Sequence, residues 1–198
     1  MESFVENIFE EMKETLNKFT AKNKNLLIAI AQEIADCFME EGKLLIFGNG
    51  GSAADAQHIA AEFINRFKIE RPSLPAIALT TDTSVLTSIS NDYDFNQVFL
   101  KQVMALADER DIVWGISTSG NSENVINALR FAATNDIKTI GFTGKDGGKM
   151  NGLCDLLLVV DSDNTARIQE MHIAAAHIIC ELVDEIMFGR FSDMLEDE

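Results

Sequence analysis

Short apolar runs alternate with longer stretches of helical periodicity from residue 43 onward, and this alternation constrains the fold more than any other feature. Runs of this kind are typical of strands that are buried on both faces of a parallel sheet. The predicted strands are residues 43–47, 76–80, 112–117, 139–143 and 156–161. The predicted helices lie near residues 52–67, 83–91, 95–107, 122–135 and 165–189. The sequence therefore predicts an α/β fold, with a doubly wound five-stranded parallel sheet and right-handed crossovers.

A helical extension precedes this alternating pattern. Residues 3–40 carry apolar side chains at helical spacing, which predicts two helices joined near residues 22–24. The helix predicted at 165–189 is apolar nearly all round, so it needs cover on more than one side. We expect a second subunit to supply that cover, and burial within its own monomer is the alternative. One domain is predicted, with N-terminal helices (1–41), an α/β core (42–190) and an acidic tail (191–198).

The charge balance excludes one class of partner. The 16 basic and 32 acidic residues give a net charge of −16. Nucleic-acid binding depends on Lys and Arg side chains that neutralise phosphates, so we expect no nucleic-acid partner. No apolar run approaches ~18 residues, so no membrane span is predicted. The three cysteines (Cys37, Cys154 and Cys180) lack metal-type spacing and the N-terminus is acidic, which favours a cytoplasmic protein with free thiols.

Two loops at the ends of predicted strands have the composition of an anion site. Residues 48–52 (GNGGS) end the first strand and open an alanine-rich helix. Such a turn presents backbone N–H groups and a positive helix end, which can hold a phosphate without a lysine. Residues 117–122 (STSGNS) place four hydroxyls at the start of another helix. Because ligands of doubly wound sheets bind beyond the carboxyl ends of the strands, the two loops predict one phosphate site.

Two other interpretations of these loops need consideration. Ser52 and Ser122 could merely cap their helices, and Asp55 follows Ser52 at the spacing of a capping box. Residues 48–53 also fit a loose dinucleotide-binding fingerprint, which requires an acidic residue about 20 positions further on. The second strand ends near Asp82, well beyond that distance, so we do not expect nicotinamide binding.

Polar residues on two helices could carry chemistry. His58 and Glu62 are four residues apart and therefore share one helix face. Gln169 and His177 lie eight residues apart on the last helix, an offset of roughly 80°, so both can border one cavity. This set suits either proton transfer or a metal such as zinc. Taken singly, His58 could be an exposed polar residue and His177 a core histidine, and His172 is predicted to be a core histidine.

Five segments in this order resemble the sugar isomerase (SIS) domain, and more narrowly the phosphoheptose isomerases. They are GNGGS (48–52), NDY (91–93), GISTSGNS (115–122), TGKDGG (143–148) and RIQEMH (167–172). The resemblance covers nearly the whole chain and implies a flavodoxin-like SIS domain in a cytoplasmic homotetramer. It also implies conversion of sedoheptulose 7-phosphate to D-glycero-D-manno-heptose 7-phosphate, the first step toward activated heptose for lipopolysaccharide or other surface glycans.

The resemblance assigns roles to individual residues. It implies substrate binding by Asn49, Gly50, Gly51, Ser52, Glu62, Asn91, Asp92, Ser117, Thr118, Ser119, Ser122 and Gln169. It implies a zinc site made of His58, Glu62, Gln169 and His177. Glu62 and His177 match the acid–base pair of the family. Ala166 is a departure, because the enzymes often carry Asp at this position, so no acid role is expected there.

One SIS relative offers a different function. DiaA binds the replication initiator DnaA, and residues 64–79 of this chain resemble it especially. Proteins of the DiaA type lack the catalytic glutamate and the second histidine, whereas this chain has Glu62 and His177. A binding scaffold has no physical need for that pair, so the enzyme is favoured. Arg66 is expected to form a surface ion pair.

Overall fold

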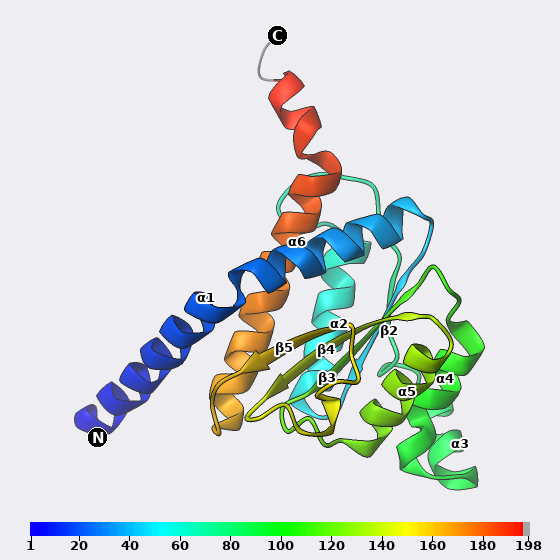
Figure 1. Cartoon of the computed structure of the whole chain (residues 1–198), viewed down its shortest axis with the longest axis horizontal. Coiled ribbons are helices and arrows are strands. Elements are labelled where there is room, and N and C mark those ends of the chain that lie inside the picture. Colours follow the sequence, from blue (N-terminus) through cyan, green and yellow to red (C-terminus); the bar gives the residue numbers. More distant parts are fainter. Residues whose placement is uncertain (196–198) are drawn as a thin grey trace.

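The predicted strands form one parallel sheet in the order β2-β1-β3-β4-β5, which confirms the predicted fold class (Figure 1). The computed structural model describes residues 1–195, and side chains as far as residue 189. The strands are Leu44–Gly48 (β1), Ala76–Ala78 (β2), Ile112–Ser117 (β3), Lys138–Gly144 (β4) and Leu156–Val160 (β5). Each strand boundary lies within two residues of its prediction, because the apolar runs are bounded by polar residues or glycine.

Helices cover both faces of the sheet. They are Glu2–Met39 (α1), Gly51–Ile64 (α2), Thr83–Asp92 (α3), Val98–Leu106 (α4), Glu123–Thr134 (α5) and Thr165–Leu195 (α6), with short 3₁₀ turns at Phe95–Gln97 and Gly148–Met150. α1, α2 and α6 pack over one apolar cluster, while α4 and α5 pack over the other. Neighbouring strand residues alternate between the clusters, with Ile46 in the first and Phe47 in the second.

The direction of chain winding reverses at β1. From β1 the chain passes through α2 to β2 at the sheet edge, and then returns to β3 on the other side of β1. α2 and α5 therefore lie on opposite faces although β1 and β3 are adjacent. In open α/β sheets the crevice at this switch point is where ligands bind. The loops after β1 and β3 meet there.

The prediction of two N-terminal helices was wrong, because α1 is one unbroken helix from Glu2 to Met39. The segment 22–24 lies inside it, and the buried Asn23 donates its side-chain amide to the Phe19 carbonyl (3.0 Å). No proline or glycine interrupts the helix. The first half of α1 projects beyond the sheet (Figure 1) and exposes Phe4 and Phe9.

Two other helix boundaries differ from the predictions. α2 ends at Ile64 rather than near residue 67, and α6 continues to Leu195. Part of the predicted acidic tail, residues 191–195, is therefore helical, and residues 196–198 lie outside the described residues. None of the described helices combines the length and the apolar character that crossing a membrane requires.

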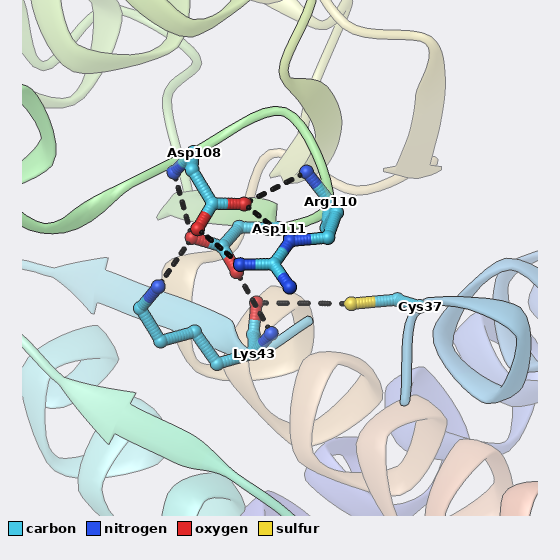
Figure 2. A network of polar contacts seen from close by, with 5 residues as sticks. All are labelled: Cys37, Lys43, Asp108, Arg110 and Asp111. Carbon is cyan, nitrogen blue, oxygen red and sulfur yellow. Dashed lines mark hydrogen bonds and ion pairs between the residues drawn. The ribbon is translucent and has the colours of Figure 1, made fainter. Parts of the chain in front are cut away.

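A polar network fixes the strands at the edge opposite to the loops (Figure 2). The buried Asp111 accepts from the Lys43 ammonium (2.6 Å) and from the backbone N–H groups of Lys43 and Asp108 (2.9 and 2.8 Å). Arg110 pairs with Asp108 through its guanidinium and holds the pKa of that carboxyl at about 2. The network joins the starts of β1 and β3, far from their carboxyl ends, so its role is structural.

Candidate active site

The two predicted phosphate loops are joined directly. The Asn49 amide donates to the side-chain oxygen of Asn124, and the Asn124 amide donates back to Asn49, both at 2.9 Å. Asn124 is buried in the first turn of α5, and sequence reasoning missed it. A fully exchanged amide pair fixes both side chains, because each uses a donor and an acceptor. The pair holds the loop after β1 against the helix that follows β3.

Glycines allow the first loop to turn sharply into α2. Gly50 is the N-cap of α2 and has φ +56°, a conformation that L side chains rarely adopt. A side chain at Gly51 would collide with the amide of Gln169 from α6. Gln169 therefore lies over the start of α2, at the first of the two loops that are predicted to bind the phosphate.

Helix capping does not explain the serines of the two loops. Gly50 rather than Ser52 occupies the N-cap position of α2, so the capping-box interpretation is wrong. Ser122 is the N-cap of α5, but its side chain forms no capping hydrogen bond. Its hydroxyl instead lies 2.9 Å from that of Ser117. The paired hydroxyls at a helix N-terminus are the kind of donors that the anion-site prediction requires.

The glycine-rich segment after β4 supports the second loop. The Gly144 N–H donates to the Thr118 carbonyl (3.1 Å), and the Lys149 N–H donates to the side chain of Asn121 (3.2 Å). Asn121 in turn donates to the Ser119 hydroxyl through its backbone N–H (3.2 Å). Lys149 forms an ion pair with Glu123 (2.9 Å), so its charge is engaged beside the loop. Residues 117–122 are thus held by backbone N–H groups from the end of β4 and from the 3₁₀ turn that follows it.

Three candidate catalytic side chains meet between α2 and α6. The Nε2 atoms of His58 and His177 are 3.2 Å apart, and His58 Nε2 lies 2.9 Å from a carboxylate oxygen of Glu62. One ligand atom of each residue lies within 4.8 Å of the others. The Phe67 ring stacks on His177, with ring centroids 5.4 Å apart. The predicted convergence of Glu62 and His177 on one place is therefore confirmed.

These three side chains offer a suitable donor set for a divalent cation. Two imidazoles and a carboxylate are common zinc ligands, and catalytic zinc sites use three protein ligands with a position left open. The two Nε2 atoms face one another, an arrangement that a shared cation or a shared proton satisfies. His58, with 46% of its side chain exposed, keeps the cluster open to solvent. The three residues thus fit the predicted metal. Gln169, the fourth predicted ligand, precedes His177 by eight residues on α6 and lies over Gly51.

Asp55 is a carboxylate at this site that sequence reasoning assigned only to capping. It precedes His58 by three residues and Glu62 by seven, so all three share one face of α2. Its Oδ2 is buried, with no hydrogen-bond partner among the described residues. Burial raises the pKa of the Asp55 carboxyl, and the neighbouring His58 partly opposes this shift. The spacing of Asp55 from His58 and Glu62 was the available signal.

Four further predicted residues have different surroundings. Asn91 and Asp92 end α3, where the Asn91 amide donates to Asp92 (2.8 Å); among the described side chains, no hydrogen bond joins either to the two loops. Their substrate-binding role stays a prediction. His172 is a core histidine as predicted: its Nε2 lies 3.1 Å from the Thr143 carbonyl, and burial lowers its pKa to about 4. Arg66 forms the expected exposed ion pair with Glu70 (3.4 Å).

Comparison with known proteins identifies the family. Residues 7–144 match the model of the SIS domain. A protein named phosphoheptose isomerase from Thermodesulfovibrio yellowstonii is 52% identical over 188 residues, which are 95% of this chain and 94% of that protein. A protein of the same name from Trichlorobacter lovleyi is 48% identical over 192 residues, covering 97% and 98% of the two chains.

Solved structures agree with the sequence comparison. The phosphoheptose isomerase GmhA from Neisseria gonorrhoeae superposes with a TM-score of 0.87 at 44% identity, covering 93% of this chain and 98% of that chain. A phosphoheptose isomerase from Francisella tularensis gives a TM-score of 0.89 at 38% identity, covering 92% and 97%. This chain belongs to the SIS domain family, and within that family to the phosphoheptose isomerases.

Proposed function

We infer that this protein isomerises sedoheptulose 7-phosphate to D-glycero-D-manno-heptose 7-phosphate. The observation that carries the inference is the meeting of His58, Glu62 and His177 on the helix that begins at the first phosphate loop and on the helix that crosses it. The similar proteins named phosphoheptose isomerase support the substrate. A product of this kind would enter the synthesis of activated heptose for lipopolysaccharide or other surface glycans.

The reaction moves one hydrogen between C1 and C2 of the open-chain sugar. Glu62 removes the C1 proton of the ketose while His177 delivers a proton to the C2 carbonyl oxygen, which gives an enediol. His177 then takes the proton of the C1 hydroxyl, and Glu62 returns its proton to C2. The C1 oxygen becomes the aldehyde of the product. Both residues return to their starting protonation states.

The helix α2 sets the reach of the site. Its first turn lies at the phosphate loop, and Glu62 follows Ser52 by ten residues. At 1.5 Å of helix rise per residue, Glu62 lies about 15 Å along the helix from Ser52 in the first phosphate loop, and His58 lies about 9 Å from it. Binding energy from the distant phosphate would then position the reacting carbons. A short sugar phosphate held by the same loops would leave its carbonyl carbon away from Glu62.

We propose that His58, Glu62 and His177 hold a zinc ion, with Gln169 as the further ligand that the family resemblance implies. A bound zinc ion would act as a Lewis acid that polarises the sugar oxygens. Glu62 and His177 would each have two tasks that compete, because coordination reduces the basicity that proton removal needs and a zinc-bound imidazole nitrogen carries no proton to donate. The Asp55 carboxyl lies one turn before His58 on the same helix face, outside the group of three ligand atoms, and its Oδ2 atom is buried.

We propose a homotetramer in the cytoplasm. Phe4, Phe9 and Leu16 of α1 are each more than two-fifths exposed, and Ile178 of α6 is 40% exposed. Exposed apolar side chains along two long helices favour packing between subunits. Cys37 and Cys180 are buried free thiols, as expected in a reducing compartment. The exposed edge of the catalytic cluster would also gain cover from a neighbouring subunit.

A DiaA-like scaffold is the alternative function, and the catalytic cluster argues against it. Purified protein incubated with sedoheptulose 7-phosphate, followed by a coupled assay of the aldose phosphate, tests the proposal directly. The assay should be run on metal-stripped protein, with and without added Zn²⁺. Absence of turnover in both, together with capture of purified DnaA, would select the scaffold. A six-carbon ketose phosphate in the same assay tests the reach of α2, and we expect a lower kcat/KM.

A further inference from the structure

A buried ion pair lies just behind the catalytic cluster, between the loop after α2 and the second half of α6. Arg71 Nε is 2.6 Å from Asp184 Oδ1, and the two side chains are only 1% and 5% exposed. The pair bridges 113 residues of sequence. Buried ion pairs of this kind are expensive to desolvate, so they call for an explanation beyond stability.

Arg71 uses its other donors on the last turn of α2 and on the adjacent Pro72 carbonyl (3.1 Å). Nη2 donates to the Glu62 carbonyl and Nη1 to the Phe63 carbonyl, both at 2.8 Å. Carbonyl groups in the last turn of a helix have no partner within the helix, and a cation there also suits the helix dipole. Arg71 therefore caps α2 at the residue whose side chain is the proposed base. The rigid guanidinium fork fixes the direction of these contacts.

We call the Arg71–Asp184 ion pair, together with the hydrogen bonds of Arg71 to α2, the clamp. Asp184 connects this clamp to the helix that carries His177. It follows His177 by seven residues on α6, which is two helical turns, so the two side chains share one face of the helix. The loop that Arg71 closes also contains Phe67, whose ring stacks on His177. The clamp thus touches the main chain of Glu62, the helix of His177 and the loop that supports the His177 ring.

We propose that Arg71 and Asp184 are positioning residues that set the spacing between Glu62 and His177. This inference rests on the proposed isomerase function for its kinetic consequence. Neither residue contacts the loops that would hold the phosphate, so the pair should act on the chemical step rather than on substrate affinity. Loss of the clamp would let the end of α2 shift on α6. A misplacement of about 1 Å is enough to lower the rate of a positioned reaction steeply.

The variant that tests this removes both charges together, as Arg71→Met with Asp184→Leu. Replacing a buried ion pair with apolar residues of similar size is often neutral for folding, whereas removing one partner leaves a buried charge. We expect kcat to fall at least 30-fold and KM for sedoheptulose 7-phosphate to change less than threefold. Lys43→Met with Asp111→Asn, which removes both charges of the pair at the opposite sheet edge and keeps a side-chain oxygen for the Lys43 backbone N–H, is the matched control and should retain kcat.

Two more measurements separate the clamp from general stability and from the proposed function. Arg71→Lys keeps the charge but lacks the fork, so we expect a normal melting temperature with a reduced kcat. In metal-stripped protein titrated with Co²⁺ alone, we expect about tenfold weaker binding in the double variant and wild-type binding in the control with Lys43→Met and Asp111→Asn. Inactive wild type would refute the isomerase but leave the Co²⁺ comparison to decide the clamp. Unchanged kcat and unchanged Co²⁺ affinity in the double variant would refute the clamp.

Discussion

Asn49 and Asn124 exchange two side-chain hydrogen bonds of 2.9 Å across the switch point of the sheet. The pair joins the loop after β1 to α5, and both loops of the proposed phosphate site depend on it. The exchange uses one N–H and one oxygen lone pair of the Asn49 amide, so Asn49 can hold the loop and still offer its second N–H to a ligand. Asn49 therefore has a structural task in this chain, in addition to the substrate contact that the family resemblance implies.

Replacing Asn124 with Ala should loosen the phosphate end of the site. The Asn49 amide would lose both partners, at a stability cost of about 1–3 kcal/mol. We expect KM for the sugar phosphate to rise severalfold while kcat falls less, because the acid–base pair lies elsewhere on α2 and α6. Steady-state kinetics and chemical denaturation measure the two effects. Asn127→Ala, on the same helix, is the control and should leave KM unchanged; an unaltered KM in Asn124→Ala would contradict the role.

The variants Glu62→Gln and His177→Ala test the acid–base assignment. Each should lower kcat by roughly 10²–10⁴-fold, the usual contribution of a positioned proton-transfer group. Circular dichroism should show an unchanged fold, since both side chains border the surface between α2 and α6. Gln57→Ala, an exposed change beside His58, should behave as wild type. Full activity in either of the first two variants would remove that residue from the mechanism.

The net charge gives a prediction about salt. A protein with a formal charge of −16 repels a sugar phosphate at long range, and salt screens this repulsion. We expect kcat/KM to rise as NaCl increases from about 10 to 150 mM, where the screening length falls from about 30 to 8 Å. Sucrose at matched osmolality should have no such effect. A fall in kcat/KM with salt would instead indicate that cationic side chains hold the phosphate.

His172 gives a prediction about stability and pH. Burial depresses its pKa from 6.5 to about 4, so the unfolded chain binds a proton more readily than the folded protein between these values. The free energy of unfolding should therefore fall as pH drops from about 6.5 to 4, with this residue contributing up to about 3 kcal/mol. Denaturant titrations at several pH values measure the slope. His172→Gln should flatten it, and an equal slope in the variant would assign the effect to other groups.

The sequence contained most of the information needed to predict the sheet. Each strand is an apolar run with polar or glycine boundaries, so the local sequence is enough to predict that the strand is buried on both faces. α1 was harder, because the segment Lys22-Asn23-Lys24 has the polarity of a loop. Its middle residue is buried and bonded to the Phe19 carbonyl of the same helix, which only tertiary packing reveals.

The site was predictable to a lesser degree. His58 and Glu62 are joined by helical spacing alone, and both loops carry a recognisable composition. His177 was grouped with them as a candidate set for proton transfer or metal binding, but its role beside Glu62 needed the family resemblance, because the crossing of α6 over α2 leaves no local pattern. Asn124 and Arg71 have partners 75 and 113 residues away. Neither pairing has a short-range signal, so single-sequence reasoning passed over both residues.

The long, uninterrupted α1 has a consequence for how the protein comes together. Its opening turns expose Phe4 and Phe9, and Arg167 of α6 holds them through the Ile8 carbonyl and the Glu11 carboxylate. A helical stretch with so little apolar burial is marginal in water. In the proposed homotetramer, ordering of these turns would be coupled to encounter with another copy, so that protomer concentration as well as the sequence of α1 would govern how completely the N-terminal segment is folded.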